Sequence, residues 1–322
     1  MAAERGTEAE LANDFVDYLN ASQSPFHCVD EVKKRLTATG FIELDERRSW
    51  EPLLKPGGKY FVSRNGSSLI AFAVGGAYEP ATSGFMIIGG HTDSPCPKLK
   101  PISKCEKEGT VMLGVVGYGG GIWHSWFDRD LTVVGRAFVK EPSGAVVARL
   151  VNVKKAIARI PTLAIHLSVA DERSSFAPNL QSHFPPILAT KIKEALWKPT
   201  VAPAVGAAAE GAAAAGCEGR HTPLLMHIVA SSLGVAPADI VDFELQLADT
   251  QPSAVIGACD EFISGGRLDN QGSCYCITRA LVDSLDGDAL AADQHVRMIS
   301  MFDHEEVREE KGATQESRRR SR

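Results

Sequence analysis

The stretch FMIIGGHTDSP, residues 85–95, joins an apolar run to two glycines and then to ionisable side chains. The apolar run predicts a buried β-strand, and the glycines let the backbone turn sharply where that strand ends. Open α/β sheets bind ligands at the carboxyl ends of their strands. The stretch therefore predicts an α/β fold in which His91 and Asp93 lie at a ligand-binding edge.

The segments on either side of this strand alternate between helical and strand patterns. This alternation predicts a mixed sheet flanked by helices, which is an α/β layer structure. Helical periodicity marks 8–20, 28–39, 221–235 and 271–285, and short apolar runs that predict strands lie at 59–64, 68–74, 239–249 and 295–302.

The middle of the chain, residues 99–249, predicts a β-rich unit inserted into the first one. Its short apolar runs are separated by turn-rich connectors and lie at 110–116, 131–139, 145–153 and 163–169. The Ala/Gly-rich segment 201–216 predicts a surface loop. A chain of 322 residues exceeds the size at which single cores stop growing, so two units are expected.

Composition limits the partners that the protein can have. Hydrophobic residues make up 44% of the chain and the net charge is −6, so we expect neither nucleic-acid binding nor membrane association. We interpret RRRSR (318–322) as a solvated tail rather than a nucleic-acid arm. The N-terminus predicts an amphipathic helix rather than a secretory leader. Seven cysteines without a CxxC pair suggest reduced thiols in the cytoplasm.

His91 and Asp93 are the first candidates for chemistry. With the period-2 spacing of a strand, both side chains would point the same way, so Asp93 could hold the His91 imidazole in one tautomer. Histidine is also a common metal ligand. The alternative is a satisfied buried histidine beside a turn aspartate.

Two further stretches carry carboxylates next to predicted elements. Asp269, between a glycine turn and a helix, is a helix N-cap or a carboxylate whose two oxygens could bridge two cations. Glu305 and Glu306 follow the strand 295–302, so one could bind a metal while the other takes a proton from water. The alternative is a solvated acidic turn. Together with His91 these residues have the nitrogen and oxygen donors of a two-metal hydrolytic site.

Other catalytic motifs are weak. GYGGGIW (117–123) lacks the lysine of a phosphate-binding loop, and no GxSxG motif of a serine hydrolase occurs. We therefore expect neither a phosphate cradle nor a serine nucleophile.

Six blocks of the sequence resemble, in order, the signature blocks of aspartyl aminopeptidases, the M18 metallopeptidases. The resemblance runs from residue 24 to residue 307. The blocks are HTDSPC, YGGGIWHSWFDRDLTVVGR, LAIHL, LADTQP, DEFISGGRLDN and FDHEEV.

This resemblance implies an aminopeptidase that removes N-terminal aspartate or glutamate from peptides with two zinc ions. His91, Asp269 and Glu306 would be the metal ligands, with Asp269 bridging both ions. Glu305 would be the general base and contact the substrate, and Asp93 would orient His91. His166 of LAIHL would help to complete the substrate site of a neighbouring subunit. Its alternative is a strand residue of the insert.

The resemblance also implies an architecture. The zinc-exopeptidase-like catalytic domain would comprise 1–98 and 250–307, the insert 99–249 would be a dimerisation domain, and the subunits would form a dodecamer. After Val307 the sequence departs from the family pattern, and the tail 308–322 is expected to be disordered. We therefore expect an incomplete catalytic domain, with an exposed apolar sheet edge and low solubility. The alternative function is an inactive subunit or interaction protein that uses the insert.

Overall fold

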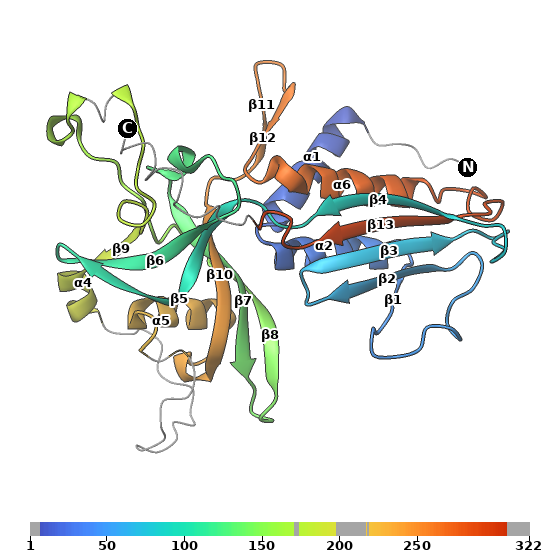
Figure 1. Cartoon of the computed structure of the whole chain (residues 1–322), viewed down its shortest axis with the longest axis horizontal. Helices are drawn as coiled ribbons and strands as arrows, with labels where there is room; N and C mark the ends of the chain where they lie inside the picture. The colour runs from blue at the N-terminus through green and yellow to red at the C-terminus, as the bar shows by residue number, and fades with distance from the viewer. Residues whose placement is uncertain (1–6, 171–173, 198–216, 218, 308–322) are drawn as a thin grey trace, which may run out of the picture.

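Two separate β-sheets, each with its own helices and core, form the two halves of the molecule (Figure 1). The computed structural model describes residues 7–170, 174–197, 217 and 219–307. The expected loop 201–216 and the expected disordered tail 308–322 lie outside the described residues. In the described part of the chain, no helix is long and apolar enough to cross a membrane.

The first sheet has five strands in the order β1-β2-β3-β13-β4. β13 runs parallel to β4 and antiparallel to β3, so the sheet is mixed, as the sequence predicts. Because β13 is the last strand of the described chain and lies between β3 and β4, residues from both ends of the sequence meet there. The strands are β1 (Ile42–Glu43), β2 (Lys59–Arg64), β3 (Ser68–Val74), β4 (Phe85–His91) and β13 (Val296–Phe302).

Three helices cover one face of this sheet: α1 (Glu8–Ala21), α2 (Pro25–Ala38) and α6 (Leu268–Asp283). Thr7 forms a capping box with Glu10 at the start of α1, and Ser24 caps α2, whose first residue is a proline. The helices bury apolar side chains against the sheet, and the resulting core includes Leu19, Val32, Leu36, Phe61, Leu69, Ile277, Ile299 and Met301.

The prediction that 85–90 is a buried strand is wrong in one respect. The strand forms, but Phe85, Met86, Ile87 and Ile88 are 49–60% exposed. β4 is the last strand of its sheet, and within the described residues only β13 pairs with it. The apolar run therefore predicts the strand correctly, but no second neighbour covers it.

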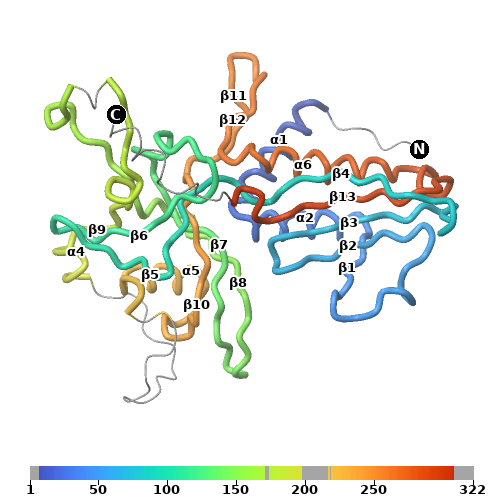
Figure 2. The backbone as a smooth tube through the Cα atoms, viewed as in Figure 1, coloured from blue at the N-terminus to red at the C-terminus, as the bar shows by residue number. Residues whose placement is uncertain are grey.

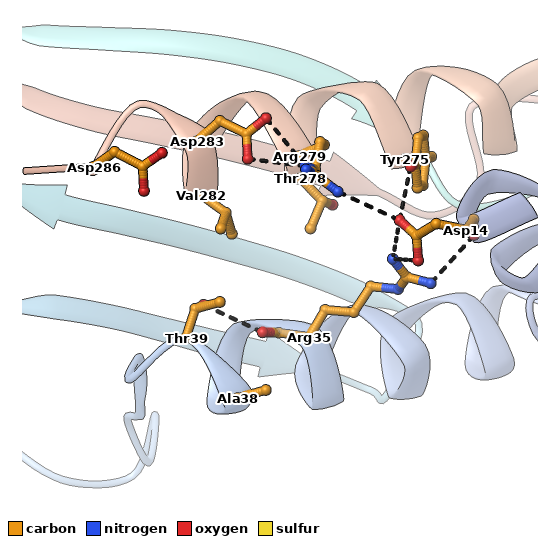
Figure 3. A pocket seen from close by; sticks show the side chains of 10 residues that line it. All are labelled: Asp14, Arg35, Ala38, Thr39, Tyr275, Thr278, Arg279, Val282, Asp283 and Asp286. Carbon is orange, nitrogen blue, oxygen red and sulfur yellow. Dashed lines mark hydrogen bonds and ion pairs between the residues drawn. The ribbon is translucent and has the colours of Figure 1, made fainter. Parts of the chain in front are cut away.

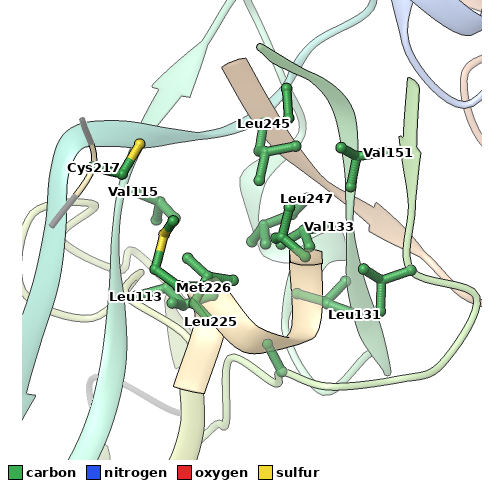
Figure 4. Close-up of a cluster of buried hydrophobic side chains, with 14 of the residues drawn as sticks. Leu113, Val115, Leu131, Val133, Val151, Cys217, Leu225, Met226, Leu245 and Leu247 are labelled. Atoms are coloured by element: carbon green, nitrogen blue, oxygen red, sulfur yellow. The ribbon is translucent and has the colours of Figure 1, made fainter. Parts of the chain in front are cut away.

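The second sheet has six strands in the order β8-β7-β10-β5-β6-β9, and each pair of neighbours is antiparallel. It curves around α5 (Pro223–Leu233), whose side chains Leu225 and Met226 fill the core (Figure 4). Thr222 caps the start of this helix, and Gly234, at φ 68°, ends it. The strands are β5 (Cys96–Lys107), β6 (Thr110–Tyr118), β7 (Leu131–Lys140), β8 (Val146–Asn152), β9 (Ile187–Thr190) and β10 (Ile240–Asp249).

Short elements complete the structure. The hairpin of β11 (Ala254–Ile256) and β12 (Phe262–Ser264) projects from the body of the molecule (Figure 2). The remaining elements are α4 (Lys191–Leu196), η1 (Trp123–Trp126), η2 (Ile165–Leu167) and η3 (Pro237–Asp239).

The prediction of a strand at 163–169 is wrong. This segment contains only the short 3-10 helix η2, and Leu163, Ile165, Leu167 and Val169 are 61–72% exposed. An apolar run forms a strand only where a neighbour supplies ladder hydrogen bonds, and no described strand pairs with this segment.

Arg136 of β7 links the two halves. Its guanidinium lies 4.2 Å from the ring centroid of Phe26 in α2 and donates to the backbone carbonyl of Asn65 at 2.7 Å. Glu244 of β10 pairs with the same guanidinium at 3.3 Å. The contact combines cation–π attraction with hydrogen bonds, and it fixes the helix layer of the first unit against the second sheet.

Candidate functional site

The carboxyl ends of β4 and β13 lie side by side, because these strands are parallel and His91 pairs with Phe302. Just beyond the strands, the Thr92 amide donates to the Phe302 carbonyl at 2.8 Å. Asn270, at the start of α6, accepts from the His91 amide at 3.2 Å. The chain thus gathers residues 91–93, 269–270 and 303–306 at one edge of the sheet.

His91 faces two carboxylates. Its Nε2 lies 3.4 Å from Oδ1 of Asp269 and 3.8 Å from Oε2 of Glu305. On the other side of the ring, Nδ1 lies 3.0 Å from the backbone carbonyl of Asp93 and 3.4 Å from its Oδ1. A proton on Nδ1 satisfies the Asp93 carbonyl and leaves the Nε2 lone pair directed toward the two acids.

Asp93 organises the turn that follows β13. Its buried carboxylate accepts from the Tyr118 hydroxyl at 2.6 Å and from the backbone amides of Glu305 and Glu306 at 3.4 and 3.0 Å. Burial disfavours the charged form, but these hydrogen bonds and the nearby His91 hold the pKa of Asp93 below its usual value. The carboxylate is therefore charged and fixes the backbone of both glutamates.

Glu305 and Glu306 have different environments, as their adjacent positions predict. The side chain of Glu305 is 61% exposed beside His91, whereas Glu306 is buried and its Oε2 accepts from the Gly120 amide at 3.1 Å. His304, at φ 70°, lies in the left-handed region that few L-residues adopt, and it reverses the chain before the two glutamates.

The donor atoms around His91 suit a zinc ion. Two ligands of a tetrahedral zinc, each about 2.0–2.1 Å from the metal, lie roughly 3.3 Å apart. The separation of 3.4 Å between Nε2 of His91 and Oδ1 of Asp269 is close to this value. The set is partial, since no three His, Cys, Asp or Glu side chains converge as a complete metal site among the residues that the structure describes.

Among the described residues, no helix amide donates to the Asp269 side chain. α6 is kinked at Asp269 and Asn270, whose backbones are non-helical, with ψ 109° at Asp269. Its side chain is 73% exposed and directed toward His91.

His166 does not join this group in a single chain. It lies in η2, in the exposed segment of the second unit, and within the described residues it forms no hydrogen bond or ion pair with His91, Asp269 or either glutamate.

Sequence reasoning missed two residues that contact the site. The Tyr118 hydroxyl comes from the last residue of β6 and the Gly120 amide from the segment that follows, both in the second unit. The motif GYGGGIW contains both residues, but neither its glycine pattern nor its place in a family block indicates that they contact the site. A glycine-rich segment allows close backbone approach to any acceptor, and here that acceptor is a glutamate carboxylate.

A separate cleft of about 440 Å³ lies between α2 and α6 (Figure 3). Most of its charged groups are paired: the Asp14 carboxylate accepts from Arg35 and Tyr275 and lies 3.6 Å from Arg279, which also pairs with Asp283. None of the candidate site residues lines it. This cleft is therefore separate from the strand-end site.

The sequence matches a known protein family and several of its members. Residues 18–318 match the family model described as "Aminopeptidase I zinc metalloprotease (M18)". The "Probable aspartyl aminopeptidase" of Ricinus communis is 45% identical over 308 residues, which cover 92% of this chain and 62% of that protein. The chain thus spans about three fifths of the length of this relative.

Two solved structures share the fold. The "Cryo-EM structure of the Ape4 and Nbr1 complex" matches with a TM-score of 0.83 and 38% identity over 92% of this chain and 55% of the other. The "Structure of Chaetomium thermophilum mApe1" matches with a TM-score of 0.79 and 36% identity over 92% and 63% of the two chains.

Proposed function

The chain belongs to the M18 family of aminopeptidase I zinc metalloproteases, and from this premise we propose that its strand-end site binds two zinc ions and serves peptide hydrolysis. His91 would bind one ion, Glu306 the other, and Asp269 would bridge them. The observation that carries the proposal is the approach of His91 Nε2 to the carboxylates of Asp269 and Glu305 at the ends of β4 and β13.

Each protein group has a distinct task in this proposal. Zinc, when bound, polarises a peptide carbonyl and makes water more acidic. Glu305, exposed beside His91, would take the proton from the attacking water. Asp93 holds His91 through its carbonyl and holds both glutamates through their backbone amides. The buried Glu306 is restrained by Gly120, so it is suited to binding a metal rather than moving protons.

We propose peptides with an N-terminal aspartate or glutamate as the substrates, because the Ricinus communis relative is named a probable aspartyl aminopeptidase. We also propose a homo-oligomer in the cytoplasm, with residues 99–249 as the dimerisation insert and His166 reaching a neighbouring site. The exposed apolar side chains around His166 and the seven free cysteines support these two points.

Zinc binding and turnover test this proposal together. The 322-residue chain is titrated with zinc, and hydrolysis of an aspartyl anilide is compared with that of a leucyl anilide. H91A should lose zinc, whereas E305Q should keep zinc and lose turnover by about 100-fold or more, since it removes the general base. E79Q, which changes an acid remote from the site, is the control. Zinc binding that H91A leaves unchanged would contradict the proposal.

The same observations support a second candidate, an interaction subunit without catalysis. The exposed segment 163–169 would then be its contact surface. Zinc binding and oligomer formation without turnover of either anilide would favour this candidate.

A further inference from the structure

Tyr118 ends β6 and Gly119 and Gly120 follow it in the second unit, yet this segment contacts the turn 303–306 of the first unit by two separate routes. The Tyr118 hydroxyl donates to Oδ2 of Asp93 at 2.6 Å. The Gly120 amide donates to Oε2 of Glu306 at 3.1 Å. The turn after β13 lies at the junction of the two units, so both routes cross that junction (Figure 2).

We infer that Tyr118, Gly119 and Gly120 are positioning residues, through which the second unit holds Glu305 and Glu306 in place for metal binding and proton transfer. This inference rests on the proposed function of those glutamates. It also means that the second unit would contribute to the site within a single chain, in addition to any role in assembly.

Tyr118 acts through Asp93. Burial first, and then the hydrogen bond to Asp93, raises the pKa of Tyr118, so its hydroxyl remains a donor. Its ring is held from the other side by Lys98, whose Nζ lies 4.0 Å from the ring centroid. Asp93 in turn restrains the backbone of the two glutamates, because the same carboxylate accepts from the amides of Glu305 and Glu306.

Gly119 acts by leaving space. At φ 78° its backbone lies in the left-handed region, and a Cβ at this position would lie 2.8 Å from Oε2 of Glu306 and 2.9 Å from its Cβ. Any side chain would therefore displace Glu306. With Oε2 bonded to the Gly120 amide, Oε1 has no protein hydrogen bond in the described part of the chain and can bind a metal.

Such an arrangement is expected of a metal-binding carboxylate. Ligating carboxylates are usually hydrogen-bonded by a second layer of residues, and loss of one such partner typically weakens metal affinity about 10–100-fold. Among the described residues, Gly120 and the backbone held by Asp93 supply that second layer for Glu306.

The test compares two tyrosines in the 322-residue chain. Y118F removes the hydroxyl that bonds Asp93, and the matched control Y275F removes the hydroxyl that donates to Asp14 at 2.7 Å, at the remote cleft. Cobalt(II) titration, followed by visible absorption, measures metal affinity. We expect Y118F to weaken cobalt binding about 10-fold, and Y275F to change it less than about 2-fold.

A second readout needs no metal. Amide hydrogen exchange of residues 303–307 should be faster in Y118F than in the wild-type chain and unchanged in Y275F, because, of these two tyrosines, Tyr118 bonds Asp93 and Tyr275 bonds the remote Asp14. G119A should give the same local acceleration. If the wild-type chain bound no cobalt or zinc, the proposed function would fail, and the exchange comparison would still decide the positioning role. Equal affinity and equal exchange in the two tyrosine variants would overturn the inference.

Discussion

Strands β7 and β4 are both apolar, but β7 is buried in the second unit whereas β4 is exposed in the first. In β7, Val133 and Val134 are fully buried, because β8 and β10 flank the strand and α5 contributes to the core on one face. In β4, Ile87 and Ile88 are more than half exposed, because β13 is the only strand that pairs with them among the described residues. Apolar sequence predicts a strand, but its number of neighbours decides its burial.

The difference extends to function. The second unit has a buried core packed around α5. Its residues Tyr118, at the end of β6, and Gly120, just after it, form hydrogen bonds with the site. The first unit supplies the chemical groups at the ends of β4 and β13, next to its exposed strand. A unit with a well-buried core thus supports a turn that belongs to a less completely covered unit.

Matched truncations of one apolar side chain in each unit should give the largest difference in the free energy of unfolding. L225A removes a fully buried side chain from the second core, and it should lower the free energy of unfolding by about 3 kcal/mol. I87A removes a side chain that is 60% exposed, and it should cost less than about 0.5 kcal/mol. Urea denaturation measures both. A cost for I87A similar to that for L225A would show that β4 is covered in solution.

Much of the fold could be predicted from the sequence. The predicted strands 59–64 and 68–74 match β2 and β3, and the predicted helix 271–285 corresponds to most of α6. These segments have strong periodicity and clear turn residues, so local pattern was sufficient. The segment 163–169 failed because an apolar run does not reveal whether a neighbouring strand exists.

The candidate site was predictable in part. His91, Asp269 and Glu305 stood out because ionisable residues followed glycines or a strand, and they do lie close together. Tyr118 was missed, since its partner Asp93 is 25 residues away and in another unit. Period-2 spacing pointed to the Asp93 carboxylate as the group that holds His91, but its backbone carbonyl lies closer to Nδ1.

Acidification should lower the free energy of unfolding by an intermediate amount, because each unit contains a buried histidine. Burial lowers the pKa of His27 and of His221 to about 4, and for His221 the charge of Arg220 adds to the effect. An unfolded histidine binds its proton near pH ~6.5. As the pH falls from about 6.5 to about 4, the unfolded state therefore binds more protons, and the free energy of unfolding decreases by up to about 1.4 kcal/mol per pH unit for each histidine.

The variants H27Q and H221Q assign this slope to the two units. Each should reduce the pH dependence of the unfolding free energy by about half in this window, as measured by urea denaturation at several pH values. Stability above pH ~6.5 should show no dependence on either imidazole. A slope that neither variant changes would mean that both imidazoles can be protonated in the folded protein.

Substitutions on the two edge strands should have the smallest effect on stability. They should differ, however, in their effect on association between chains. I87K on β4 and V146K on β8 each place a charge on an exposed apolar position of an edge strand, so both should change the unfolding free energy by less than about 0.5 kcal/mol. β4 combines four consecutive exposed apolar residues with an edge that no other described strand pairs, which favours pairing between chains. Light scattering at increasing protein concentration should therefore show less association for I87K and no change for V146K. If V146K reduced association as strongly as I87K, the contrast between the two edges would be lost, and general surface charge would account for the result.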